Sequence, residues 1–191
     1  MEEEKLVEKV KEILSSERLA HTLGVVQTAR MLSEKYGADS GKAVIAALLH
    51  DIARDHDRNT LLQMVRNFGI VIDEVSAAQP ELLHQLVGAE LARRDFGITD
   101  PAIINAIRIH TTGSVRMSLL DKIVYLADFI EPGRDFPGVE QIRKKAWEDL
   151  DEGLLASTVN TIRYLLEKGK LIHTSTVALY NELQLIKSRQ E

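Results

Sequence analysis

The stretch AVIAALLHD, residues 43–51, decides the fold, because seven apolar residues in a row lead directly into His50 and Asp51. A helix that is apolar on every side belongs in the interior of a protein. A buried helix seldom ends in two ionisable side chains without a partner, since burying such groups costs free energy. Histidine suits the negative end of a helix dipole, but aspartate does not. The pair therefore indicates a buried site that holds a cation.

Further candidate ligands occur on separate predicted helices, and they are His21, His84, His110 and Asp128. Asp128 interrupts the apolar segment YLADFI, where a carboxylate is costly without a cation. His84 carries the weakest signal, because its segment is only mildly amphipathic and holds no second motif. Nitrogen and oxygen ligands without sulfur suit Fe, Mn, Zn, Ni or Co. The pattern predicts a metal centre.

Helical periodicity runs along nearly the whole chain, and no segment alternates with a period of two. Several boundaries carry capping signals, such as Asp100-Pro101 and the capping box formed by Ser118 and Asp121. The predicted helices cover roughly residues 6–14, 17–36, 40–50, 60–68, 80–96, 101–110, 119–131, 139–166 and 174–187. No repeat, low-complexity tract or linker separates them. The sequence therefore predicts one all-α domain.

Composition limits the partners. The chain has 191 residues, a net charge of −5 and no cysteine, which excludes disulfides and thiolate ligands. An acidic protein is a poor general binder of nucleic acids or anionic membranes. No apolar run approaches the ~20 residues that span a bilayer, and the N-terminus lacks the apolar core of a signal peptide. We expect a cytoplasmic protein with no nucleic-acid or membrane partner.

The ordered histidines and aspartates resemble the HD-domain superfamily of metal-dependent phosphohydrolases in its two-metal version. The segments HDIAR at 50–54, HTTG at 110–113 and KIVYLADFIEPGR at 122–134 are similar to those of the YqeK family, whose members are symmetrical bis(5'-nucleosyl)-tetraphosphatases. The similarity runs from about Glu17 to about Glu182. It implies a single-domain helical bundle of the HD type, with a core at roughly 17–135 and C-terminal helices at 138–188 packed on it.

The resemblance also implies how the site is divided. One ion would be held by His21, His50, Asp51 and Asp128, and the second by His84 and His110, with Asp51 bridging. Two ions about 3.5–4 Å apart can acidify a shared water that attacks phosphorus. Iron is the expected metal, with Mn, Co, Ni or Zn as alternatives. The implied reaction converts diadenosine tetraphosphate into two ADP, and the predicted catalytic residues are His50, Asp51 and Arg54.

Side chains near these ligands are the candidates for substrate binding. Guanidinium groups hold phosphate oxygens in pairs, which lysine cannot do. The predicted contacts to a dinucleoside polyphosphate or nucleotide are Arg54, Lys122, Arg134, Thr111 and Gly113. The candidate faces for stacking on a base are Tyr125, Phe129 and Phe136. Neither the preferred base nor the choice among these rings follows from the sequence.

Other interpretations remain open. His56 and His173 fit ordinary surface or turn positions, and Asp121 fits a helix cap better than a ligand. The ligand set alone also fits an HD-type diiron oxygenase, or a nucleotide-binding regulatory protein without turnover. A cyclic-dinucleotide phosphodiesterase is disfavoured, because the Gly-Tyr-Pro element of those relatives is absent after His110. The amphipathic C-terminal helices could serve either the core or a homodimer.

Overall fold

The computed structural model describes residues 3–189, which form eleven α-helices and one 3-10 helix and contain no β-strand. The elements are α1 (Glu3–Ile13), α2 (Ser16–Tyr36), α3 (Ser40–Leu49), α4 (Arg58–Phe68), α5 (Glu74–Ala78), η1 (Pro80–Leu82), α6 (Leu83–Arg94), α7 (Pro101–Ile109), α8 (Leu119–Ile130), α9 (Val139–Glu148), α10 (Leu150–Glu167) and α11 (Thr174–Lys187). The all-α prediction is confirmed. None of the described helices is both long and apolar enough to cross a membrane.

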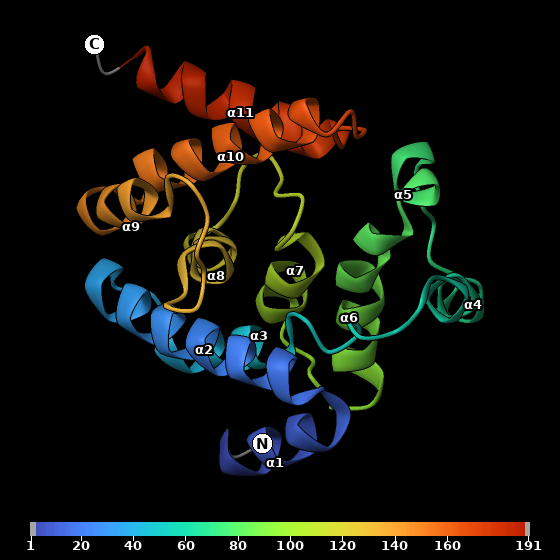
Figure 1. Ribbon diagram of the computed structural model, residues 1–191. Coiled ribbons are helices and arrows are strands. Elements are labelled where there is room, and N and C mark those ends of the chain that lie inside the picture. Colours follow the sequence, from blue (N-terminus) through green and yellow to red (C-terminus); the bar gives the residue numbers. More distant parts are fainter. Residues whose placement is uncertain (1–2, 190–191) are drawn as a thin grey trace.

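Helix α3 is the centre of the packing, as its composition predicts. It contacts α1, α2, α6, α7 and α8. Its fully buried side chains include Ala46, Leu48 and Leu49. In Figure 1, α2 lies across the lower part of the molecule with α3 behind it, while α6, α4 and α5 lie to one side. The C-terminal end of α3 therefore points into the interior, where His50 and Asp51 follow.

The predicted helix starts are mostly correct, with three local differences. Helix α4 begins earlier than Asn59 or Thr60, because the Asp57 carboxylate accepts hydrogen bonds from the backbone N–H of both residues. The short helix α5 was not predicted. The helix expected from Pro80 begins as the 3-10 turn η1, and its α-helical part starts at Leu83.

The stretch at 139–166 is two helices instead of one. The chain is extended at Asp149, with φ −147° and ψ 127°, and the Asp149 side chain caps α10. Helices α9 and α10 then pack very closely, because a Cβ added at Gly153 would lie 2.5 Å from the Cα of Ala146. Helix α10 also packs on α8, and α11 packs on α10. These C-terminal helices form the upper layer in Figure 1.

Candidate metal centre

The six predicted metal ligands meet at the ends and inner faces of five helices. His50 is the C-cap of α3 and Asp51 follows it, while His110 is the C-cap of α7. His84 lies in the first turn of α6, His21 in the second turn of α2, and Asp128 near the end of α8. Their ligand atoms form three overlapping groups of three residues. Within each group the ligand atoms lie within 4.8 Å of one another, and the three groups together include all six residues. The tertiary structure thus gathers residues from position 21 to position 128.

The rings of three histidines are oriented by the backbone. The Nδ1–H of His50, His84 and His110 donates to the carbonyl three residues earlier, over 2.7, 2.5 and 2.8 Å respectively. Because a carbonyl can only accept, Nδ1 carries the proton and Nε2 keeps its lone pair. The fourth ring, His21, has its Nδ1 at 3.2 Å from Glu131 Oε1. All four Nε2 atoms are therefore oriented toward the cluster as candidate ligand atoms.

Asp51 lies between two pairs of these rings. Its Oδ1 is 3.3 Å from His84 Nε2 and 3.6 Å from His110 Nε2. Its Oδ2 is 3.8 Å from His21 Nε2 and 3.6 Å from His50 Nε2. A single carboxylate thus faces one histidine pair with each oxygen.

Asp128 lies nearest to one of the two histidine pairs, the pair formed by His21 and His50. Its Oδ1 lies 3.1 Å from His21 Nε2 and 3.8 Å from His50 Nε2. The pair formed by His84 and His110 is grouped with Asp51, and His110 is also grouped with His50 and Asp128. One side of Asp51 is therefore richer in negative charge than the other.

Two features of the cluster call for a cation. The Nε2 atoms of His21 and His50 are buried and have no hydrogen-bond partner among the described residues. The Nε2 atoms of His84 and His110 lie 3.1 Å apart, although each carries a lone pair. Unpaired buried acceptors and facing lone pairs are both unfavourable in the absence of a positive partner. The donor set is therefore compatible with a divalent metal ion.

The protonation states also suit a metal. Burial lowers the pKa of His50 to about 4 and lowers that of His84, so both rings are neutral at pH 7. Burial raises the pKa of Asp51, but the surrounding imidazoles of His50, His110 and His84 bring it well below its ordinary value. Metal ligands must be neutral imidazoles and ionised carboxylates. These groups already meet that requirement.

His21 and Asp128 form the ion-paired edge of the cluster. Burial lowers the pKa of His21, but the neighbouring carboxylates of Asp128 and Glu131 outweigh burial and leave the pKa raised. Burial raises the pKa of Asp128, whereas the nearby imidazoles of His21 and His50 and the charge of Arg134 hold it well below its ordinary value. Metal binding at His21 must therefore displace a proton more often than at His50.

Two residues of the site were missed in the sequence. The Arg18 Nη1 donates to Asp51 Oδ2 over 2.9 Å, and Glu131 holds His21. Arg18 precedes His21 by three residues, a spacing that places both on one helix face. Glu131 is a carboxylate at the C-terminal end of α8, the same mismatch with the helix dipole that singled out Asp51. Both signals were present in the sequence.

Three of the predicted substrate contacts adjoin the cluster. The Arg134 Nη2 lies 2.5 Å from Asp128 Oδ1. The Arg54 Nη1 donates to the Glu81 carbonyl over 3.1 Å and lies 3.4 Å from His84 Nδ1. The Thr111 Oγ1 is 3.1 Å from His84 Nε2. Two guanidinium groups and a hydroxyl thus border the metal ligands.

The other two predicted contacts have neighbours elsewhere. The Lys122 Nζ lies 2.5 Å from Asp151 Oδ1, so its charge is already paired with α10. Gly113 has a φ of +65°, and a Cβ there would lie 2.4 Å from Leu179 Cδ2, so backbone conformation and packing explain this glycine. Their roles in substrate binding stay predictions. Asp121 is a helix cap, as expected.

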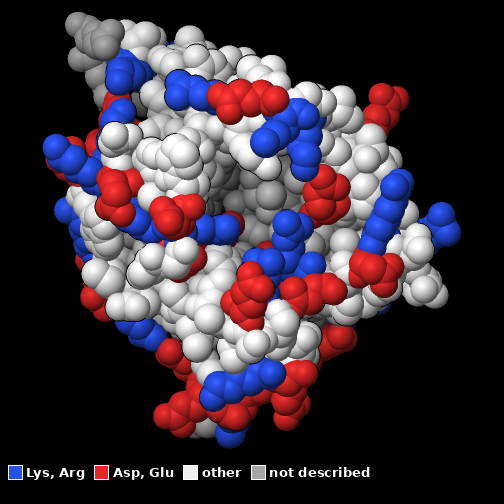
Figure 2. All heavy atoms as spheres, in the orientation of Figure 1, with Lys and Arg blue, Asp and Glu red and all other residues white. Residues whose placement is uncertain are grey.

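A cavity of about 640 Å³ opens beside the cluster. Thr111, Asp128 and Arg134 line it, together with the aromatic side chains Tyr125, Phe129, Phe136 and Tyr164. The rings of Phe129 and Phe136 meet edge to face at 5.2 Å. Figure 2 shows a hollow on this face, between the positions of α7, α8 and α10, with Lys and Arg side chains beside it. All three predicted stacking residues therefore line one cavity next to Asp128.

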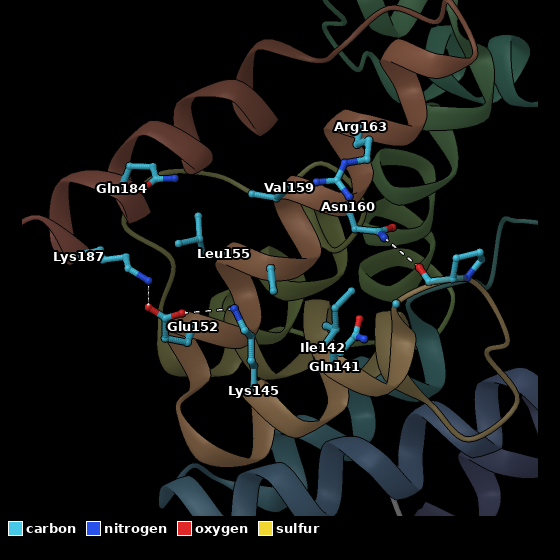
Figure 3. Close-up of a pocket in the computed structure, with 13 residues that line it drawn as sticks. Gln141, Ile142, Lys145, Glu152, Leu155, Val159, Asn160, Arg163, Gln184 and Lys187 are labelled. Atoms are coloured by element: carbon cyan, nitrogen blue, oxygen red, sulfur yellow. Dashed lines mark hydrogen bonds and ion pairs between the residues drawn. The ribbon is translucent and has the colours of Figure 1, made fainter.

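A second cavity, of about 330 Å³, lies between α9, α10 and α11 (Figure 3). It shares Pro137, Asn160 and Arg163 with the aromatic cavity, and the Asn160 amide donates to the Pro137 carbonyl over 3.4 Å. Glu152 is paired there with Lys187 at 2.8 Å and with Lys145 at 3.7 Å. None of its lining residues belongs to the metal-ligand cluster.

Known proteins resemble this chain over nearly its full length. The HD domain family model matches residues 18–133. A symmetrical bis(5'-nucleosyl)-tetraphosphatase of Halalkalibacterium halodurans is 44% identical over 95% of this chain and 96% of its own. The protein of the same name from Bacillus subtilis is 41% identical over 96% and 98%. A Clostridium acetobutylicum crystal structure, described as a "predicted HD superfamily hydrolase involved in NAD metabolism", has 40% identity and a TM-score of 0.92, covering 96% of this chain and 97% of that one.

Proposed function

This chain belongs to the HD-domain family, and we propose that it is a metal-dependent hydrolase that cleaves symmetric dinucleoside tetraphosphates into two nucleoside diphosphates. The observation that carries the proposal is the placement of Asp51 between two histidine pairs, beside an aromatic cavity. The names of the two bacterial relatives support hydrolysis over the oxygenase and regulatory alternatives.

We infer that the site takes two divalent ions, with iron as the expected metal. His21, His50, Asp51 and Asp128 would hold one ion, and His84 and His110 the other, with Asp51 shared. The division of the Asp51 oxygens between the two histidine pairs supports this count. When bound, such ions acidify water and neutralise charge on phosphate oxygens.

The arginines around the cluster would bind the polyphosphate. Arg134 lies on the side of Asp128 and the aromatic cavity, whereas Arg54 lies on the side of His84. A tetraphosphate cut at its centre leaves two phosphates on each side, so cations on two sides match the substrate. Because a nucleoside diphosphate is a good leaving group, its departure needs little help from a protonated side chain.

The aromatic cavity would bind one nucleoside. Stacking on an aromatic ring stabilises any base, because every base has a π face. The cavity walls come from α8 and from α10, on which Asn160 and Tyr164 lie. We therefore propose that the C-terminal helices at 138–188 belong to the same functional unit as the core at 17–135.

Product analysis tests this function. The metal-reconstituted protein is incubated with diadenosine tetraphosphate, with a chelated sample as the control. We expect ADP as the sole product, lost on chelation. AMP plus ATP would overturn the position of cleavage, and no product with Fe, Mn, Co or Ni would overturn the hydrolase. A homodimer, a cytoplasmic location and the lack of a nucleic-acid partner stay predictions.

A further inference from the structure

We propose that Glu131 is a positioning residue that sets the ring orientation and tautomer of His21, and thereby the metal affinity of the site. His21 is the one ligand candidate whose Nδ1 is not bonded to a backbone carbonyl. It lies inside α2, where the carbonyls of the preceding turn are already used by the helix. An acceptor for its Nδ1–H must therefore come from another element, and Glu131, just after α8, supplies it.

Both oxygens of the Glu131 carboxylate are used. Oε1 accepts from His21 Nδ1 over 3.2 Å, and Oε2 accepts from the backbone N–H of Gly133 over 2.5 Å. The residue is only 4% exposed. A buried carboxylate is costly unless its oxygens are satisfied, so both bonds are needed to keep it there. A glutamine cannot replace it fully, because an amide offers one acceptor oxygen and not two.

Helix α2 makes room for this carboxylate. Gly24 follows His21 by three residues, and a Cβ at Gly24 would lie 2.6 Å from Glu131 Oε2. Glycine inside a helix is less stable than alanine by up to about 1 kcal/mol. The approach of Glu131 gives a physical reason for a glycine at this position.

The bond has a direct consequence for the metal centre. With the Nδ1–H of His21 held by Glu131, its Nε2 faces Asp128, 3.1 Å away, on the side of the proposed metal position. Glu131 Oε1 also lies 4.0 Å from Arg134 Nε, so the same carboxylate adjoins a proposed phosphate contact. The inference rests on the proposed metal site but not on the reaction that occurs there.

The test measures Mn²⁺ affinity by calorimetry without substrate, and the His21 tautomer in the metal-free protein by ¹⁵N NMR. For Glu131→Gln we expect an affinity loss of about 10–100-fold, the usual effect of removing a partner of a metal-binding histidine. We also expect the Nε2–H tautomer of His21 to increase. Gly24→Ala displaces the same carboxylate without changing it, and should act in the same direction. Gly41→Ala is the matched control, because Gly41 is an exposed helical glycine in α3. It should leave both the Mn²⁺ affinity and the His21 tautomer unchanged.

A purely structural role for Glu131 is tested with Arg143→Gln. Arg143 donates to the carbonyls of Ile130, Glu131 and Arg134, so the substitution loosens the same turn and leaves the carboxylate in place. We expect Arg143→Gln to preserve the His21 tautomer and most of the affinity. Equal affinity losses for Arg143→Gln and Glu131→Gln, or an unchanged tautomer in Glu131→Gln, would overturn the inference. If Glu131→Gln does not fold, the Mn²⁺ affinity and His21 tautomer of Gly24→Ala test the inference in its place. A protein that binds Mn²⁺ as expected but fails to cleave the substrate would refute only the function.

Discussion

Replacing Asp51 by asparagine should almost abolish the stabilisation of this protein by metal. Asp51 lies within 3.8 Å of the Nε2 atoms of all four histidines, so it contributes to both proposed ion positions. Asparagine keeps the size of the side chain and removes its charge. Loss of a residue that merely supports a ligand costs about 10–100-fold in metal affinity. Loss of a carboxylate shared by both ion positions should lower the metal affinity by at least the upper end of that range, about 100-fold.

This loss converts into a measurable shift in melting temperature. A metal at ~100 times its dissociation constant stabilises the folded protein by about 2.7 kcal/mol. After a 100-fold loss of affinity, the same concentration contributes only about 0.4 kcal/mol. For a chain of 191 residues, 1 kcal/mol corresponds to roughly 2–4 °C. Mn²⁺ should therefore raise the Tm by about 5–11 °C in the unaltered protein and by about 1–2 °C in Asp51→Asn.

Thermal melting with and without Mn²⁺ measures both shifts. Asp121→Asn is the matched control, because Asp121 is also a buried carboxylate but caps α8 outside the ligand cluster. It should lower the Tm of the metal-free protein and leave the metal-induced rise unchanged. A full rise in Asp51→Asn, or an equal loss in Asp121→Asn, would refute the assignment of Asp51 as the shared ligand.

Three further predictions test the packing, a surface ion pair and the aromatic cavity. Gly153→Ala should lower the Tm, because its Cβ would lie 2.5 Å from Ala146 Cα and overpacking costs about 1–3 kcal/mol; an unchanged melting curve would contradict the close packing of α9 and α10. Burial raises the pKa of Asp73, but hydrogen bonds from Ser76 and His173 hold it well below its usual value. The charge of Asp73 therefore stabilises the fold fully above about pH 4, and this stabilisation decreases as the pH falls toward and through the folded-state pKa. Asp73→Asn should then cost about 0.2–1 kcal/mol in urea denaturation at pH 7 and less than that near pH 2, and a constant difference would contradict this. Phe129→Ala should raise the KM for diadenosine tetraphosphate by about 5–150-fold with little change in kcat, since stacking contributes about 1–3 kcal/mol per base; an unchanged KM would exclude Phe129 as the stacking face.

The sequence by itself determined most of the helices and the set of candidate metal ligands. The buried helix at 40–49, the capping box at Ser118 and the order of the six ligands follow from periodicity and side-chain chemistry. These signals are local, because a helix is stabilised by contacts three or four residues apart and its caps by the first turn. A carboxylate within an apolar helix is also a local signal, because its burial is costly and therefore predicts a cation or hydrogen-bond partner.

Only the tertiary structure decided what surrounds those ligands. The hydrogen bond between His21 and Glu131 joins residues 110 positions apart, and that between Arg18 and Asp51 joins residues 33 apart. The pairing of Lys122 with Asp151 and the aromatic cavity likewise depend on how α8 and α10 pack. Such contacts are set by the crossing of helices that bury apolar faces, and many crossings satisfy the same pattern. The sequence pattern therefore names the candidate ligands, and the packing of the helices determines which side chains orient them.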